Sequence, residues 1–106
     1  MRGETRFKKR IPCKLTRSKS TFSGLVLDLS RRGLFVQTSA VATTGDEVEV
    51  ALSGRDSGVA IVVTAKVVWQ RKIPMHFQSV VQAGLGLQIY NAPEAFYHLL
   101  SEASQS

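Results

Sequence analysis

Two short stretches carry the residues whose chemistry suits an anionic ligand. The first, residues 28–33 (DLSRRG), places a carboxylate and a hydroxyl two positions apart at the end of an alternating segment. Side chains two apart on a strand share a face, so we expect Asp28 and Ser30 to project together into solvent. Gly33 follows in a turn, where a residue without Cβ lets a ligand approach the backbone closely.

The second stretch is the basic run of residues 6–10 (RFKKR). Arg6 and Arg10 are four positions apart, a spacing that points both side chains the same way in an extended or a helical segment. Guanidinium groups form bidentate pairs with phosphate oxygens or with the O6 and N7 atoms of guanine, and they stack on purine faces. Together the two stretches predict one anion site built from two parts of the chain.

Positive charge is concentrated near the N-terminus. Residues 1–19 contain eight of the 14 lysines and arginines but one of the eight acidic residues, so the rest of the chain is nearly neutral. Such a distribution suits a compact anion better than a long one. Each stretch alone also has a simpler interpretation, a solvated basic tail for residues 6–10 and an ordinary hairpin turn for residues 28–33.

Composition sets the outer limits of the interpretation. A chain of 106 residues with 43% hydrophobic residues is typical of one globular domain. No apolar run approaches the roughly 20 residues of a membrane span, and no signal peptide is visible, so we expect a cytoplasmic protein without membrane insertion. The single cysteine, Cys13, cannot form an internal disulfide and is expected to be a small strand residue in a reducing compartment.

Catalytic chemistry finds little support in the sequence. Neither His76 nor His98 has a Cys, His or carboxylate at a spacing typical of metal ligands, and no Gly-x-Ser-x-Gly nucleophile motif occurs. We therefore expect a protein that is not an enzyme and that holds neither a metal nor a cofactor.

Short strands must position the two stretches. Period-two alternation predicts strands at 11–16, 22–29, 33–37, 47–52, 59–70 and 77–90. In the second of these, Leu25, Leu27 and Leu29 share one face and are expected in the core. In the fifth, Trp69 shares a face with Val63, Ala65 and Val67 and is expected inside as well.

The last predicted strand carries two glycines and leads into a helix. Gly84 and Gly86 share one face, so another backbone or a flat group could approach that face closely. Asn91 is expected to cap a helix whose apolar stripe closes the open end of the sheet. The stripe consists of Phe96, Leu99, Leu100 and Ala103. An all-β chain of about six antiparallel strands with one C-terminal helix favours a small barrel.

In order along the chain, these features resemble the PilZ domain, a bacterial receptor module for cyclic di-GMP. The resemblance rests on Arg-x-x-x-Arg followed by Ile-Pro, and on Asp-x-Ser-x-x-Gly at the end of the next strand. It covers nearly the whole chain, because Val67-Val68-Trp69 and residues 84–89 also fall where the family has related patterns. It implies a flexible basic arm at 1–10, a six-stranded antiparallel PilZ-type barrel at 11–90 and a helix at 91–103.

The resemblance also implies the ligand-binding residues. It assigns cyclic di-GMP binding to Arg6, Arg10, Asp28, Ser30 and Gly33. Lys9, Arg31 and Arg32 are expected to be solvated charges or additional phosphate contacts. Many family members that bind the dinucleotide as an intercalated pair have an arginine where this chain has Thr5, which favours one ligand per chain.

The functional hypothesis is a non-catalytic cyclic di-GMP receptor that rearranges its N-terminal arm on binding and signals to a partner protein. One alternative is a PilZ-fold protein interaction module with weak or no nucleotide binding. A second is a small nucleic-acid-binding barrel. The second is disfavoured because aromatic residues make up 8% of the chain and Phe7 is the one aromatic within the basic arm.

Overall fold

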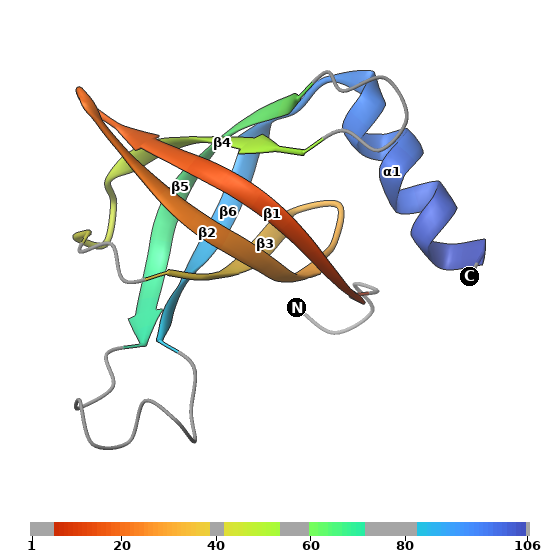
Figure 1. The fold of residues 1–106 in the computed structure, drawn as a ribbon, viewed down its shortest axis with the longest axis horizontal. Helices are drawn as coiled ribbons and strands as arrows, with labels where there is room; N and C mark the ends of the chain where they lie inside the picture. The colour runs from red at the N-terminus through yellow and green to blue at the C-terminus, as the bar shows by residue number, and fades with distance from the viewer. Residues whose placement is uncertain (1–5, 39–41, 54–59, 72–82, 106) are drawn as a thin grey trace.

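A computed structural model describes residues 6–38, 42–53, 60–71 and 83–105 (Figure 1). The described residues form six strands and one helix: β1 (Phe7–Arg17), β2 (Ser20–Leu29), β3 (Gly33–Gln37), β4 (Glu47–Leu52), β5 (Ile61–Arg71), β6 (Gly84–Asn91) and α1 (Glu94–Gln105). The predicted loop at His76 and the start of the predicted strand at 77–90 lie outside these residues.

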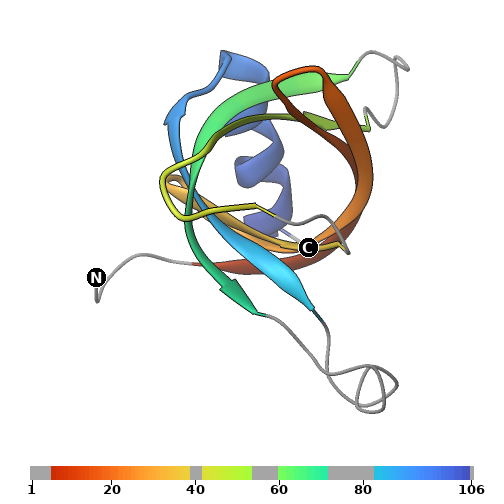
Figure 2. The same cartoon turned by 90° about the vertical axis from the view of Figure 1, so that its left-hand side faces the viewer.

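The strands close into one antiparallel barrel in the order β1-β2-β3-β6-β5-β4. Figure 2 shows them encircling a central axis, with α1 at the far end. Closure removes the exposed strand edges that an open sheet of this size would leave. The predicted fold class, a six-stranded antiparallel barrel with one C-terminal helix, is confirmed.

Alternation of apolar and polar residues builds the core of the barrel. On β4, Val48, Val50 and Leu52 are buried while Glu47 and Glu49 are exposed. The same alternation buries Val63, Ala65 and Val67 on β5, as predicted, and all six strands contribute residues to the core. Its largest fully buried side chains are Phe96, Leu15, Leu29, Leu34, Leu52 and Leu85.

Helix α1 covers one end of the barrel, as predicted. Phe96 is fully buried and belongs to the same core cluster as the strand residues, with Leu99 and Leu100 beside it. The predicted cap is wrong, because Asn91 still pairs with Thr64 as the last residue of β6. No helix among the described residues is long and apolar enough to cross a membrane.

Three sequence predictions about strand bounds and faces are corrected by the structure. The first strand begins at Phe7 rather than at Ile11, because Phe7 pairs with Leu29 and packs partly against the core. The predicted arm at 1–10 therefore contributes its last four residues to the barrel.

On β2, Leu25 and Leu27 are only partly buried, whereas Val26 and Leu29 are fully buried. A register shift between Val26 and Asp28 inserts one extra residue, so the buried face changes from even to odd positions.

The third correction concerns Trp69, which is 45% exposed rather than packed inside. Val63, Ala65 and Val67 are fully buried as predicted. A register shift between Val67 and Trp69 then turns the indole to the outer face.

Candidate functional site

The predicted site residues lie where the barrel's strand pairing is irregular. Three register shifts surround this region, in β1 after Lys8, in β2 before Asp28 and in β5 before Trp69. Between the shifts, one row of residues crosses five strands in direct register. The row runs Lys8, Asp28, Phe35, Gly86, Trp69. Directly opposed residues on neighbouring strands have adjacent side chains, so this row brings a cation, a carboxylate and two aromatic rings onto one outer face.

Arg6 and Asp28 are brought together, as the sequence predicted. The Arg6 Nε–H donates to Asp28 Oδ1 at 3.0 Å, and Nη2 donates to the same oxygen. Both side chains keep solvent contact, with exposed fractions of 44% and 27%. Because both donors use Oδ1, Asp28 Oδ2 can still accept a hydrogen bond from a ligand.

Ser30 does not lie beside Asp28 on the wet face, so that prediction is wrong. Its side chain is fully buried, and its Oγ accepts the backbone N–H groups of Gly33 at 3.1 Å and Arg32 at 3.3 Å. The backbone N–H of Ser30 also bonds to the Gly33 carbonyl at 2.9 Å. The chain turns immediately after Leu29, and the hydroxyl stabilises this turn from within. The predicted hairpin between β2 and β3 is confirmed.

Gly33 is required by the close approach of a neighbouring strand. A Cβ at this position would lie 2.8 Å from the carbonyl oxygen of Leu87 on β6 and 3.8 Å from Arg6 Nη1. The first distance is shorter than a van der Waals contact, so a larger residue would displace β6 or the turn.

The two turn arginines lie in different surroundings. The Arg31 guanidinium lies 5.5 Å from the ring centroid of Tyr97 on α1, a cation–π distance. Arg32 instead lines the pocket described below. The structure therefore separates two positions that the sequence treated alike.

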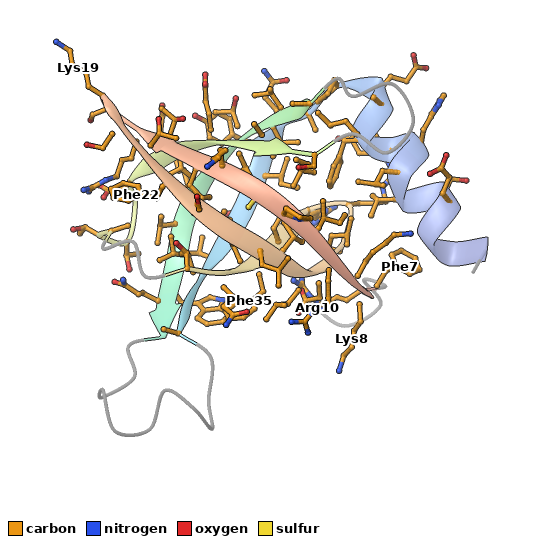
Figure 3. The ribbon with its side chains drawn as sticks, viewed as in Figure 1. Phe7, Lys8, Arg10, Lys19, Phe22 and Phe35 are labelled. Atoms are coloured by element: carbon orange, nitrogen blue, oxygen red, sulfur yellow. The ribbon has the colours of Figure 1, made fainter. Side chains whose placement is uncertain are left out.

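Arg10 and Lys9 lie on β1 in the shifted segment, and neither is among the pocket-lining residues. Arg10 is exposed, and Figure 3 shows Lys8, Arg10 and Phe35 along the lower side of the barrel. Arg6 and Arg10 are both exposed, and buried and exposed positions alternate without a break from Phe7 to Leu15, so the even spacing agrees with the structure although Arg10 lies outside the pocket. Lys8, which the sequence did not single out, is the direct cross-strand neighbour of Asp28.

A pocket of about 520 Å³, which we call the Asp28 pocket, is open to solvent at this face. Arg6, Asp28, Arg32 and Gly33 line its polar side. The volume lies within the range of roughly 300 to 1,000 Å³ that is usual for small-molecule sites.

The opposite side of the Asp28 pocket is aromatic. The rings of Trp69 and Phe35 stack with centroids 5.2 Å apart and planes 12° apart. The indole lies directly on Gly86, where a Cβ would come within 2.1 Å of it. From Gly84 and Gly86 we expected a backbone or a flat group to approach this face of β6. At Gly86 the flat group is the indole of Trp69.

Two observations concern metal-binding and thiol groups in the described part of the chain. No group of three or more His, Cys, Asp or Glu residues is placed there to hold a metal. Burial raises the pKa of the Cys13 thiol to about 11, so the thiol stays protonated near neutral pH. The assembled groups can pair with an anion, accept from a ring N–H and stack on a flat base.

Comparison with known proteins gives one family and two similar structures. The family model described as the PilZ domain matches residues 1–103. The structure resembles the Bacillus subtilis inhibitor of motility, MotI/DgrA, with a TM-score of 0.75 and 13% identity over 98% of this chain. It also resembles the PilZ domain with c-di-GMP of YcgR from Escherichia coli, with a TM-score of 0.69 and 16% identity over 98% of this chain.

The matched lengths differ between the two structures. This chain spans 49% of the MotI/DgrA chain and 89% of the YcgR domain. At these identities the two likenesses concern the fold alone. No curated protein matches this sequence.

Proposed function

The chain belongs to the PilZ domain family, a family of cyclic di-GMP receptors and adaptors, and we propose that it is itself a non-catalytic receptor for cyclic di-GMP. The observation that carries this proposal is the Asp28 pocket, where motif residues and an aromatic stack line one space. Arg6, Asp28 and Gly33 supply the motif side, and Trp69 supplies the exposed ring.

The chemistry of the pocket is complementary to the ligand. Cyclic di-GMP has two phosphates and two guanines, so it needs cationic groups, acceptors for the guanine N1 and N2 donors, and flat apolar surface. Arg6 and Arg32 can pair with phosphate oxygens. Asp28 can accept from the guanine edge, and Trp69 can stack on a base. We propose one ligand per chain, because one pocket of about 520 Å³ carries all of these groups.

The other predicted residues take supporting roles in this proposal. Ser30 shapes the turn that presents Arg32 and Gly33, since its hydroxyl bonds within the turn. Arg10 is proposed to approach a phosphate from the exposed face of β1, whereas Lys9 is partly buried in phase with Phe7 and Ile11 and is given no contact in this proposal.

We also propose that binding rearranges the N-terminal segment. Asp28 is paired with Arg6 in the structure, so a guanine that uses Asp28 Oδ1 must displace Arg6. Arg6 can then turn to a phosphate, which changes the surface ahead of β1 for a partner protein to recognise. Hydrogen exchange of residues 2–12 with and without ligand tests this step, and unchanged exchange would contradict it.

Calorimetry with cyclic di-GMP and with a short single-stranded DNA tests the receptor itself. We expect submillimolar or tighter binding of the dinucleotide with one site per chain, and none of the DNA. Binding of the DNA alone would favour a nucleic-acid barrel. Silence toward both would favour a protein interaction module. Lys19→Ala is a matched control for Arg6→Ala, because Lys19 lies at the far end of the barrel from Lys8 and Arg10 (Figure 3).

A further inference from the structure

Gln88 lines the Asp28 pocket, and the sequence assigned it no role in ligand binding. It projects from the same outer face of β6 as Gly86, two positions away, and it is exposed. Two positions along a strand correspond to roughly 7 Å. A purine lying on the Trp69 indole, which covers Gly86, therefore has an edge within reach of the Gln88 side chain.

The neighbours of Gln88 leave its amide open toward the pocket. Its cross-strand partners are Gly33 on β3, which has no side chain, and Lys66 on β5. The Lys66 Nζ lies over the Tyr90 ring, 5.9 Å from the centroid. Within the described part of the chain, the Gln88 side-chain amide makes no hydrogen bond.

The backbone at Gln88 is held firmly against the turn of the site. The N–H of the next residue, Ile89, donates to the Arg32 carbonyl at 2.7 Å. Register pairing with Gly33 fixes the strand on the same side. Because the strand is already fixed, a ligand that binds Gln88 has to order only the side chain and not the backbone, which favours a contact with defined geometry.

Building on the proposed function, we propose that Gln88 is a specificity-determining residue whose amide N–H donates to guanine N7. Asp28 lies two strands away from β6, roughly 10 Å across the sheet. Its carboxylate matches the N1 and N2 donors on one flank of guanine. N7 is an acceptor on the other flank, and a neutral amide N–H matches it without adding charge. The two side chains would thus recognise opposite flanks of the bases bound in one pocket.

The chain offers a matched control for this proposal. Gln37 projects from the outer face of β3, two positions beyond Phe35, and it is not among the residues that line the Asp28 pocket. Gln88→Ala and Gln37→Ala remove the same group from neighbouring strands. Both ligand-free variants are expected to melt close to the wild type.

The test is titration calorimetry of wild type, Gln88→Ala and Gln37→Ala with cyclic di-GMP and with its 7-deazaguanine analogue, which lacks N7. We expect Gln88→Ala to bind cyclic di-GMP about five- to tenfold more weakly, the value of one hydrogen bond, and Gln37→Ala to match the wild type. The wild type should bind the 7-deazaguanine analogue more weakly than cyclic di-GMP. In Gln88→Ala the difference between the two ligands should be smaller, because this variant has already lost the contact to N7.

Two results would overturn the assignment of Gln88 while leaving the receptor proposal intact. One is unchanged binding of cyclic di-GMP by Gln88→Ala. The other is an equal loss on removal of N7 in the wild type and in Gln88→Ala. Failure of the wild type to bind cyclic di-GMP would instead overturn the receptor proposal, and the role of Gln88 with it.

Discussion

The barrel has a regular region and an irregular one, and they differ in what their side chains do. Strand β4 pairs with β1 and with β5 without any register shift. Around the Asp28 pocket, by contrast, shifts occur in β1, between β2 and β3, and between β5 and β6. In the regular region alternate side chains fill the core, whereas in the irregular region the chemically useful side chains face outward.

The difference shows how a small barrel can carry a binding site without opening its core. An extra residue in a strand changes which side chains face outward beyond that point. At Asp28 and Trp69, such shifts place a carboxylate and an indole on the outer face. Fully buried residues flank both shifts, among them Val26, Leu29 and Val67, so the core continues beneath the site.

The largest expected effect comes from truncating a leucine of the regular region. Leu52 on β4 is fully buried, so Leu52→Ala should lower the free energy of unfolding by about 2 to 5 kcal/mol. Leu27, at the register shift of β2, is only partly buried, and Leu27→Ala should cost less than about 1 kcal/mol. Urea unfolding of both variants measures the contrast. Equal losses would show that the irregular region is packed as tightly as the regular one.

The next effect concerns the charged side of the Asp28 pocket. Arg6→Ala should weaken cyclic di-GMP binding by about 1.5 to 3 kcal/mol, because charge-assisted hydrogen bonds to phosphate are lost. The exposed pair with Asp28 should contribute about 1 kcal/mol or less to stability. Calorimetry and thermal melting separate the two quantities. A large loss of ligand-free stability would mean that Arg6 is structural.

The aromatic side of the pocket should give a smaller effect on binding. Trp69→Ala should cost on the order of 1 kcal/mol of binding free energy, at the low end for base stacking, because the neighbouring Phe35 ring remains. Trp69→Phe, which keeps a ring, is the control and should recover most of the affinity. Quenching of indole fluorescence by ligand in the wild type checks the contact directly. Unchanged affinity in both variants would exclude stacking at this position.

Sequence reasoning succeeded where the strand pairing is regular. Val63, Ala65 and Val67 were predicted in the core and are fully buried, because simple alternation holds along that part of β5. When the same alternation is extended by two residues to Trp69, it predicts the wrong face. A register shift depends on the partner strand, which a single strand's periodicity does not contain.

The candidate site was predicted in part for the same reason. The motif located Arg6, Asp28 and Gly33, and the structure brings them to one pocket. It could not place Ser30, because the direction of its hydroxyl is set by the turn that follows Leu29. Gln88 was also missed, since its position beside Gly33 follows from the pairing of β3 with β6.

The smallest effect is expected at the turn that leads into β4, in the regular region. Asp46 accepts the Thr43 N–H at 2.8 Å and pairs with Arg17 at 2.8 Å, and these two contacts lower the pKa of its carboxyl. A carboxyl with a lowered folded-state pKa stabilises the fold above its unfolded pKa of about 3.9, and that contribution is lost as the pH falls through the folded value.

Asp46→Asn should therefore unfold at slightly lower urea than the wild type at pH 7, and the two midpoints should converge in acid. Arg17→Met is a useful companion, because it removes the ion pair but keeps the Thr43 bond, which is the larger cause of the lowered pKa. The urea midpoint of Arg17→Met should still exceed that of Asp46→Asn at pH 7, by less than the wild type does, and this gap should also close in acid. A constant gap between wild type and Asp46→Asn across the whole pH range would contradict this, because the effect of Asp46 would then not depend on its ionisation.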